Sequence, residues 1–371
     1  MQSNRSLVSP TSHPTLQKAL EEKLATRQIA GHSLGQLDAL AIRLGLLQGT
    51  LSPRFRDPQL LIFAADHGLA VDGIAVPVGQ QTQHLVQHML TGKLPLSVFA
   101  RTQQVELAVI DCGVSENLQV HEQLLVRKIA HGTRNSRVTS AMSVEQAHAA
   151  MRAGMELGNK LRGNATLLAG VGVGAHESAA MVLARLTECP IRDLLLSGPD
   201  MPKESLSHTM KIVRGVQNRH RAVADPVEVL AAYGGFEVAV MVGVMLMAAG
   251  RRQLLVIDGM AACAALMIAS RIAPPVTDYC VFARSHPHKG LDAAMGLFRA
   301  SALLEMGLEH IDGTGAALTW PIVRCAAALL SDPSEELDAD LSEPVPFADH
   351  ENAFDDTFND AHLGFRDKPL Y

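Results

Sequence analysis

The sequence predicts an α/β protein whose parallel sheet is covered by helices. Its 371 residues contain continuous apolar runs, which are typical of strands buried on both faces. Helical patterns lie between the runs, and this alternation predicts a parallel sheet. Apolar residues make up 47% of the chain and aromatic residues 4%, so it can bury a large core of mainly small aliphatic side chains. The predicted strands are Leu60–Ala65, Val105–Ile110, Ala165–Val173, Gln253–Ile257 and Tyr279–Ala283.

The first part of the chain predicts an arm followed by two helices. Residues 1–14 are polar, and we expect them to form a flexible arm. Leu16–Leu24 has a helical pattern. Leu34–Leu47 has apolar residues at helical spacing and stops near Gly49, a residue type that often ends helices. We therefore expect the main domain to begin at residue 15.

Two later helix starts are marked by their capping residues. Ser143, followed three residues later by Gln146, forms a capping box. Asp225 is a favourable N-cap, and Pro226 suits the first helical position. The following stretch, Val229–Ala249, is apolar nearly all round, so we expect it to be buried.

The composition changes near Ser331. Residues 331–371 contain twelve Asp or Glu residues against one Arg and one Lys. Such a charge block with few apolar residues cannot form a core, so it predicts an acidic, disordered tail. The main α/β domain is then expected to span residues 15–330.

The overall composition argues against several classes of partner. The net charge of −6 argues against a nucleic-acid binder. Five dispersed cysteines without a CxxC pair indicate free thiols in a reducing compartment. The longest uncharged apolar run, Val238–Gly250, is too short to span a bilayer, and the N-terminus lacks a signal pattern. We expect a cytoplasmic protein with no membrane partner.

Polar groups cluster where the predicted strands end. These groups are Asp66-His67-Gly68, Gly170–Gly174, Asp258-Gly259 and Ser285-His286. Ligands of parallel sheets bind outside the carboxyl ends of the strands. We therefore expect these groups to meet at one edge of the sheet and to form the functional site.

The stretch Leu308–Leu318, LEHIDGTGAAL, adds a candidate anion site and a candidate base. Gly313, Thr314 and Gly315 form a small turn before an Ala-rich helical pattern. The free N–H groups and the dipole at the start of a helix attract anions. Asp312 stands at the edge of this turn as a carboxylate that can accept a proton.

Two other classes of site are disfavoured. His84 and His88 have i, i+4 spacing, and His286 and His288 are close in sequence, but no HExxH pattern or cysteine partner accompanies them. We interpret them as polar surface histidines and expect no metal. Gly170–Gly174 lacks the GxGxxG spacing of a dinucleotide site, and the chain has no GK[ST] P-loop.

Eight stretches, in order and spacing, resemble one family over about residues 15–330: the nicotinate-nucleotide–dimethylbenzimidazole phosphoribosyltransferases. The set is specific, although each stretch alone is weak. The stretches are His32–Asp38 (HSLGQLD), Phe63–Gly68 (FAADHG), Ile110–Val114 (IDCGV), Gly132–Asn135 (GTRN), Asp225–Leu230 (DPVEVL), Gly234–Glu237 (GGFE), Val256–Gly259 (VIDG) and Asp312–Leu318 (DGTGAAL).

This resemblance implies a fold and a reaction. The expected fold is a Rossmann-like α/β domain with a small helical subdomain built from both chain ends, and the expected assembly is a homodimer. The expected reaction moves the 5-phosphoribosyl group from nicotinate mononucleotide to 5,6-dimethylbenzimidazole, giving α-ribazole 5′-phosphate and nicotinate for the cobalamin nucleotide loop. It needs neither a cofactor nor a metal.

The resemblance also implies roles for residues at matching positions. Asp312 takes the place of the family's catalytic glutamate and is one methylene shorter, whereas Gly170 replaces a second glutamate, which His176 or Glu177 could compensate. Gln83 is the expected pocket glutamine, with Gln81 or His84 as alternatives. The residues expected to bind the phosphate or nucleotide are Gly172, Gly174, Lys211, Ser285, Gly313, Thr314 and Gly315, and those expected in the base pocket are Asp66, His67, Ala75 and Gln83.

Two alternatives follow from the changed residues. With Gly170 and Asp312 in place of glutamates, the chain could be a relative that binds a nucleotide or aromatic base without catalysis. It could also be a transferase that accepts a different base. Turnover of the unmodified protein separates the first alternative from an enzyme, and competition between bases separates the second.

Overall fold

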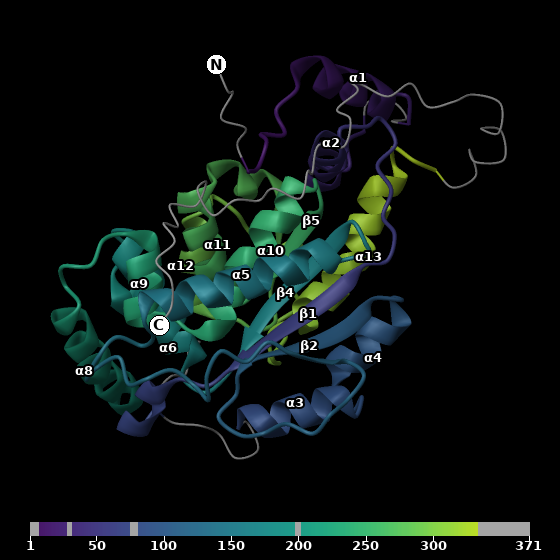
Figure 1. Ribbon diagram of the computed structural model, residues 1–371. Coiled ribbons are helices and arrows are strands. Elements are labelled where there is room, and N and C mark those ends of the chain that lie inside the picture. Colours follow the sequence, from purple (N-terminus) through teal and green to yellow (C-terminus); the bar gives the residue numbers. More distant parts are fainter. Residues whose placement is uncertain (1–6, 28–31, 75–80, 197–201, 333–371) are drawn as a thin grey trace, which may run out of the picture. The chain divides into compact units, whose positions relative to one another are not determined.

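The computed structural model describes residues 7–27, 32–74, 81–196 and 202–332. Within these residues the chain forms one six-stranded sheet in the order β3-β2-β1-β4-β5-β6, and all neighbouring strands are parallel (Figure 1). The five predicted strands are confirmed. The strands are β1 Gln59–Ala65, β2 Glu106–Gly113, β3 Leu124–Val126, β4 Ala165–Val171, β5 Leu254–Asp258 and β6 Cys280–Ala283.

The short strand β3 was not predicted, because it carries no continuous buried run. It pairs only with β2, through Val109 to Leu124 and the two following residue pairs. Leu124 is buried, but Val126 is 58% exposed, as is typical of a strand at the edge of a sheet. In β1, β4, β5 and β6, by contrast, every residue is buried.

Helices cover both faces of this sheet. Gly170 on β4 faces Met241 of α10 and Ala261 of α11, whereas its neighbour Ala169 faces Gly313 at the start of α13. Because successive strand residues point to opposite faces, α10 and α11 lie on one face and α13 on the other. The helices are α1 Pro14–Ala25, α2 Gln36–Gln48, η1 Gly68–Asp72, α3 Thr82–Leu90, α4 Pro95–Thr102, α5 Val144–Lys160, α6 Ala175–Leu186, α7 Ile191–Leu195, α8 Lys203–Arg219, α9 Pro226–Tyr233, α10 Phe236–Gly250, α11 Met260–Ile272, η2 Pro274–Tyr279, α12 Lys289–Gly296 and α13 Thr314–Ala328.

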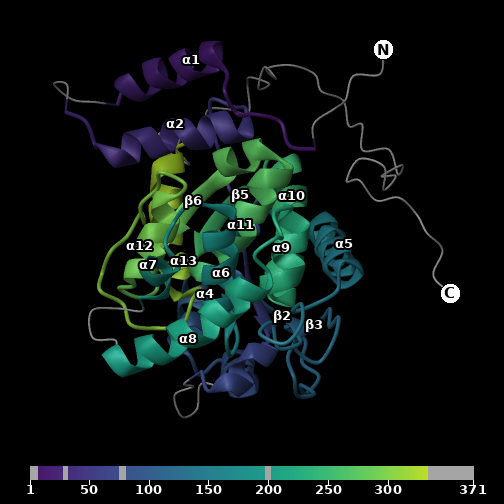
Figure 2. The same ribbon diagram turned by 90° about the vertical axis from the view of Figure 1, so that its left-hand side faces the viewer.

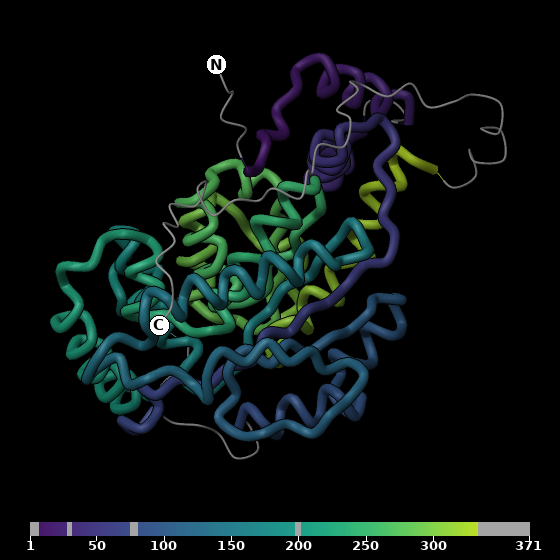
Figure 3. Tube along the Cα trace, viewed as in Figure 1, coloured from purple at the N-terminus to yellow at the C-terminus, as the bar shows by residue number. Residues whose placement is uncertain are grey.

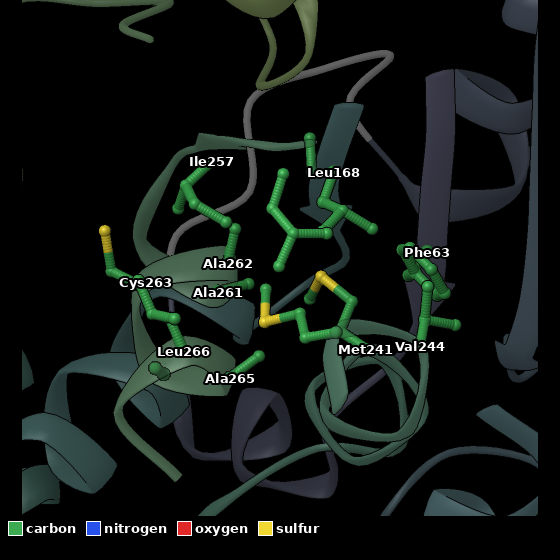
Figure 4. Close-up of a cluster of buried hydrophobic side chains, with 14 of the residues drawn as sticks. Phe63, Leu168, Met241, Val244, Ile257, Ala261, Ala262, Cys263, Ala265 and Leu266 are labelled. Atoms are coloured by element: carbon green, nitrogen blue, oxygen red, sulfur yellow. The ribbon is translucent and has the colours of Figure 1, made fainter. Parts of the chain in front are cut away.

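The predicted buried stretch is confirmed, but it forms two helices. Helix α9 ends at Tyr233 and α10 begins at Phe236, and the intervening Gly234 and Gly235 have no room for a side chain. Fourteen of the fifteen residues of α10 are buried, so it is the central helix of the core. Figure 4 shows side chains of α10 and α11 meeting those of Phe63, Leu168 and Ile257.

Both predicted helix caps are confirmed. The Ser143 hydroxyl accepts from the N–H of Gln146, and the Gln146 side chain accepts from the N–H of Ser143. The Asp225 carboxylate accepts from the N–H groups of Val227 and Glu228, at 2.9 and 3.1 Å. These caps fix where α5 and α9 begin and thereby place the loops that precede them.

The two ends of the described chain meet at the amino ends of the strands. Helix α1 packs on α2, and α2 packs on α13 (Figures 2 and 3). The expected helical part built from both chain ends is therefore present. It lies away from the carboxyl ends of the strands, where the candidate site is found.

The described part of the predicted arm, residues 7–13, is packed against the domain. Val8 is fully buried. The Ser9 carbonyl accepts from the Tyr279 hydroxyl at 2.8 Å, and the Thr11 N–H donates to Asp278 at 3.1 Å. For these residues the expectation of a loose arm is wrong, because one apolar side chain and two hydrogen bonds anchor the segment to η2.

At the other end, contacts divide the chain after Asp332, two residues beyond the predicted boundary. Ser331 donates its hydroxyl to the Pro53 carbonyl at 2.6 Å and so belongs to the main unit. The predicted tail from residue 333 onward lies outside the described residues. In the described part of the chain, no helix is long and apolar enough to cross a membrane.

Candidate active site

The polar loops predicted to converge do meet at the carboxyl edge of the sheet. The His67 N–H donates to the Val173 carbonyl at 3.1 Å, which joins the loops after β1 and β4. Ser285 donates to Asp258 at 2.7 Å, which joins the loops after β5 and β6. The rings of His176 and His288 lie 4.5 Å apart and bring the two halves together.

The turn before α13 already holds an anion, the buried carboxylate of Asp258. Its Oδ2 accepts from the N–H groups of Gly313 and Ala316, each at 2.9 Å. Ser285 donates to the same oxygen and accepts from the N–H of Gly315 at 2.8 Å. These donors were expected to bind a substrate phosphate, but here an internal carboxylate occupies the helix N-terminus.

Thr314 is also committed to the turn rather than open to a ligand. It is 2% exposed, and its hydroxyl donates to the Ile311 carbonyl at 2.8 Å. The ring of His310 shares the same hydroxyl at 2.8 Å. Gly315 is required here, because a Cβ would lie 2.1 Å from the Arg284 carbonyl oxygen.

Asp312 lies beside this closed turn and keeps part of its carboxylate open. His286 Nε2 contacts its Oδ1 at 2.8 Å, and 15% of the side chain is exposed. Its Oδ2 lies 1.9 Å from the position that a Cβ of Gly259 would take, so only glycine allows this approach. Burial, together with the nearby charge of Asp258, raises the pKa of Asp312 well above its usual range. A carboxylate in this setting holds a proton more readily than an exposed one.

Three imidazoles form a cluster that begins at His286, the contact of Asp312. The ring centroids of His286 and His288 are 5.9 Å apart, and those of His288 and His176 are 4.5 Å apart with the rings tilted by 56°. Burial lowers the pKa of each ring, and in His288 it falls to about 2. The interpretation of surface histidines is wrong for His288, which is 6% exposed, whereas His84 and His88 are exposed and 38% of the His286 side chain is exposed. Among the described residues, no group of His, Cys, Asp or Glu is arranged to hold a metal ion.

The loop before α6 is the other candidate anion site. A Cβ on Gly172 would lie 1.7 Å from the Ala65 carbonyl oxygen, and Gly174 has a φ of +82°, so both positions require glycine. Within the described residues, the N–H groups of His176 and Glu177 in the first turn of α6 have no hydrogen-bond partner. The start of α6 thus keeps two free N–H donors, whereas the N–H groups at the start of α13 are used within the protein.

Asp66 and His67, expected in the base pocket, are both used by the protein itself. Asp66 accepts from the Thr82 hydroxyl and from the N–H and hydroxyl of Ser115, the last two at 2.7 and 2.8 Å. His67 Nε2 contacts Glu237 at 3.1 Å, and the side chains are 2% and 0% exposed. Burial alone would lower the pKa of His67, but Glu237 and, to a smaller degree, Asp66 and Glu177 together raise it.

The remaining predicted residues are only partly placed. Gln83 on α3 is half-buried, whereas the alternatives Gln81 and His84 are exposed. Lys211 is exposed on α8, one turn after His208, whose ring contacts the Asp72 carbonyl at 3.2 Å. Ala75 lies outside the described residues.

Gly170 has no space for the glutamate of the family pattern. A Cβ there would lie 2.6 Å from that of Ala261. The nearest carboxylate side chain to that position is Glu237, whose Cγ lies 3.6 Å away. Glu237 is the last residue of the GGFE stretch, and the sequence assigns it no role. The signal that could have singled it out is an acidic residue inside an otherwise apolar helix, following two glycines.

Comparisons with known proteins find relatives over most of the chain. A family model described as "Phosphoribosyltransferase" matches residues 9–340. The nicotinate-nucleotide–dimethylbenzimidazole phosphoribosyltransferase of Cupriavidus taiwanensis is 38% identical over 336 residues, covering 90% of this chain and 96% of that protein. The enzyme of the same name from Janthinobacterium sp. is 37% identical over 317 residues, or 84% and 91% of the two chains.

The chain belongs to the nicotinate-nucleotide–dimethylbenzimidazole phosphoribosyltransferase family. The crystal structure of the family member from Thermus thermophilus superposes with a TM-score of 0.79 at 27% identity, covering 86% of this chain and 96% of that one. Family membership confirms the predicted fold class. Within the family fold, this chain combines Asp312 with a glycine at position 170 and a histidine cluster.

Proposed function

We propose that the protein transfers the 5-phosphoribosyl group from nicotinate mononucleotide to 5,6-dimethylbenzimidazole, in assembly of the cobalamin nucleotide loop. The products are α-ribazole 5′-phosphate and nicotinate. The observation that carries the proposal is the Asp312 carboxylate, which is placed at the carboxyl edge of the sheet with Oδ2 free of hydrogen bonds among the described residues. Relatives that carry this activity in their names match nearly the whole chain.

The chemistry needs one general base. A ring nitrogen of the acceptor attacks C1′ of the phosphoribosyl group, while the bond from C1′ to the nicotinate nitrogen breaks and its electron pair goes to the leaving pyridine ring. The acceptor must also lose its N–H proton, which Asp312 takes on Oδ2. The raised pKa of Asp312 makes its ionised carboxylate a stronger base than an exposed aspartate.

We assign the phosphate to the start of α6. The glycines 172 and 174 and the free N–H groups of His176 and Glu177 support this assignment. Lys211, which is exposed on α8, is the cation proposed for the same phosphate. Ser285, Gly313 and Gly315 act indirectly, since they hold Asp258 and thereby fix the turn that carries Asp312.

The assembly and location are also proposals. We infer a cytoplasmic homodimer that needs no cofactor. The buried free thiols of Cys112, Cys263 and Cys280 support a reducing compartment. Sedimentation velocity at micromolar protein tests the dimer directly, and a purely monomeric species would contradict it.

The function is tested by following nicotinate release from nicotinate mononucleotide with and without 5,6-dimethylbenzimidazole. We expect release to depend on the base and to be accompanied by a new ribotide in chromatography. If adenine or a phenolic base, added in competition, supports nicotinate release as well as 5,6-dimethylbenzimidazole does, the result would instead point to a different acceptor. Binding of both substrates without release would indicate the non-catalytic relative.

A further inference from the structure

His286 is the residue in direct contact with the proposed base. Its Nε2 lies 2.8 Å from Oδ1 of Asp312. Gly259 lies against the other oxygen, Oδ2, on the side of β5. The carboxylate is thus held between an imidazole and a backbone, and its orientation depends on both.

The backbone of His286 is itself anchored. Arg284 Nε donates to the His286 carbonyl at 2.9 Å. The same guanidinium pairs with Asp292 at 2.6 Å and with Glu305 at 3.1 Å. These contacts tie the His286 backbone to the side chain of Arg284, which is itself paired on both sides of the loop after β6.

The ring of His286 also reaches open space, as a residue in contact with the site should. It is 38% exposed and lines a cavity of about 160 Å³. The cavity walls are Arg284, His286, Pro287, Glu305, Met306, Gly307 and Leu308. His286 therefore stands between this cavity and Asp312.

Burial and three basic side chains near His286 favour its neutral form. Burial is the largest cause that lowers its pKa, followed by His176 on α6, Arg284 on its own loop and His310 before α13. Asp312 faces Asp258 from β5 and Cys263 from α11, and burial and the Asp258 charge raise its own pKa. A neutral imidazole has one N–H, and placing it on Nε2 lets His286 donate to Oδ1 of Asp312.

This charge state matters for catalysis. A cationic partner such as arginine would stabilise the carboxylate and make it a weaker base. A neutral donor fixes the orientation of Oδ1 and leaves Oδ2 able to accept a proton. Asp312 is one methylene shorter than glutamate, so its direction has to be controlled closely; a misplacement of about 1 Å can lower a rate roughly 10²-fold.

We propose that His286 is a positioning residue for the transfer reaction, whose Nε2–H holds Oδ1 of Asp312 so that Oδ2 faces the N–H of the acceptor base. The inference rests on the proposed function. In the step, the acceptor's proton moves to Oδ2, its other ring nitrogen bonds to C1′, and nicotinate leaves with the electron pair of the broken bond. His286 keeps its own proton throughout.

Two isosteric substitutions test the role. The amide nitrogen of Gln lies near the place of imidazole Nε2, and that of Asn near Nδ1. We expect His286→Gln to keep kcat within roughly threefold, and His286→Asn to lower it roughly 10–100-fold with little change in KM for nicotinate mononucleotide. If His286→Gln and His286→Asn lower kcat equally, the proposal is overturned. That result would indicate a histidine that transfers a proton, because neither amide can do so.

A double-mutant cycle separates positioning from general damage. Once Asp312→Asn has removed the base, adding His286→Asn should lower the residual rate less than about twofold. If the double variant lowers the rate by the full product of the two single effects, the proposal is contradicted. Thermal unfolding of each variant shows whether it is folded before its rate is interpreted.

A measurement without turnover keeps the inference testable if the transfer itself is not observed. The pKa of the Asp312 carboxyl can be followed by ¹³C NMR on protein labelled at Asp Cγ, with the signal assigned by its absence in Asp312→Asn. Because His286 donates to the charged form, its loss should raise this pKa in His286→Asn and leave it near wild type in His286→Gln. An unchanged value in His286→Asn would reject the contact, whereas absent turnover alone would reject only the proposed function.

Discussion

Two histidine–carboxylate pairs at the same edge of the sheet differ in almost every physical respect. His67 and Glu237 are 2% and 0% exposed, and the pKa of His67 is raised by its carboxylate partner. His286 and Asp312 are 38% and 15% exposed, and the pKa of His286 is lowered. The first pair is therefore closed to solvent and favours the protonated histidine, whereas the second is open and favours the neutral histidine.

The difference shows that residue types alone do not assign a role. The His67–Glu237 pair links the loop after β1 to the core helix α10, and neither side chain has a surface for a ligand. In the second pair, the carboxylate keeps one oxygen available. Burial and the number of internal partners thus separate a structural pair from a chemical one.

The largest expected effect is on the open pair. Asp312→Asn removes the proton acceptor and keeps the shape, so we expect turnover to fall roughly 10²–10⁴-fold. Nicotinate mononucleotide should still bind, as measured by calorimetry. Wild-type turnover in this variant would remove Asp312 as the base and end the functional contrast between the pairs.

The next effect concerns the closed pair and is one of stability. His67→Leu leaves the Glu237 carboxylate buried without its partner, and we expect a loss of about 3–5 kcal/mol in the free energy of unfolding. His67→Gln, which keeps an N–H near Nε2, is the matched control and should lose less. His286→Leu should cost under about 1 kcal/mol, because Asp312 keeps solvent access. Equal losses for His67→Leu and His286→Leu in urea unfolding would break the comparison.

A smaller effect separates the two regions by their pH dependence. His288 has its pKa lowered to about 2 in the folded protein. The pKa of His288 in the unfolded chain is about 6.5. Protonation of His288 therefore lowers the free energy of unfolding progressively as the pH falls below that value, by about 2 kcal/mol at pH 5. His67 has the opposite sign: its raised pKa stabilises the fold below the unfolded value, and this is lost as the pH rises through the folded pKa.

Two variants check these opposite signs. His288→Asn keeps a side chain that can cap α12 but removes the titration, so the loss of stability between pH 7 and pH 5 should shrink. His67→Gln should instead enlarge the loss of stability between pH 7 and pH 5. Urea unfolding at the two pH values measures both, and shifts in the same direction would show that the two environments are not opposed.

The smallest expected effect lies outside both pairs. Because contacts divide the chain after Asp332, a chain cut there keeps the bonds of Ser331 to Pro53 and of Asp332 to Arg27. We expect its turnover and thermal midpoint to match those of the full chain. A cut after Leu330 removes both bonds and is the matched comparison. A lower midpoint for the cut after Asp332 would assign the acidic segment a stabilising role.

The sequence determined the elements whose cause is local. Apolar runs predicted five strands, because strands buried on both faces need apolar residues at every position. Ser143 and Asp225 predicted their helix starts, because a cap acts over three or four residues. The order of eight short stretches identified the family, and the strand ends correctly predicted that the polar loops meet at the carboxyl edge.

Only the tertiary structure decided which polar groups remain available to a substrate. The turn at Gly313–Gly315 has the sequence of an anion site, but Asp258, 55 residues earlier, fills it. His67 follows a strand as a ligand-binding histidine would, but its ring contacts the carboxylate of Glu237 from a distant helix. Hydrogen bonds and burial act between residues far apart in the chain, so a sequence names the candidates, whereas packing decides which of them are free.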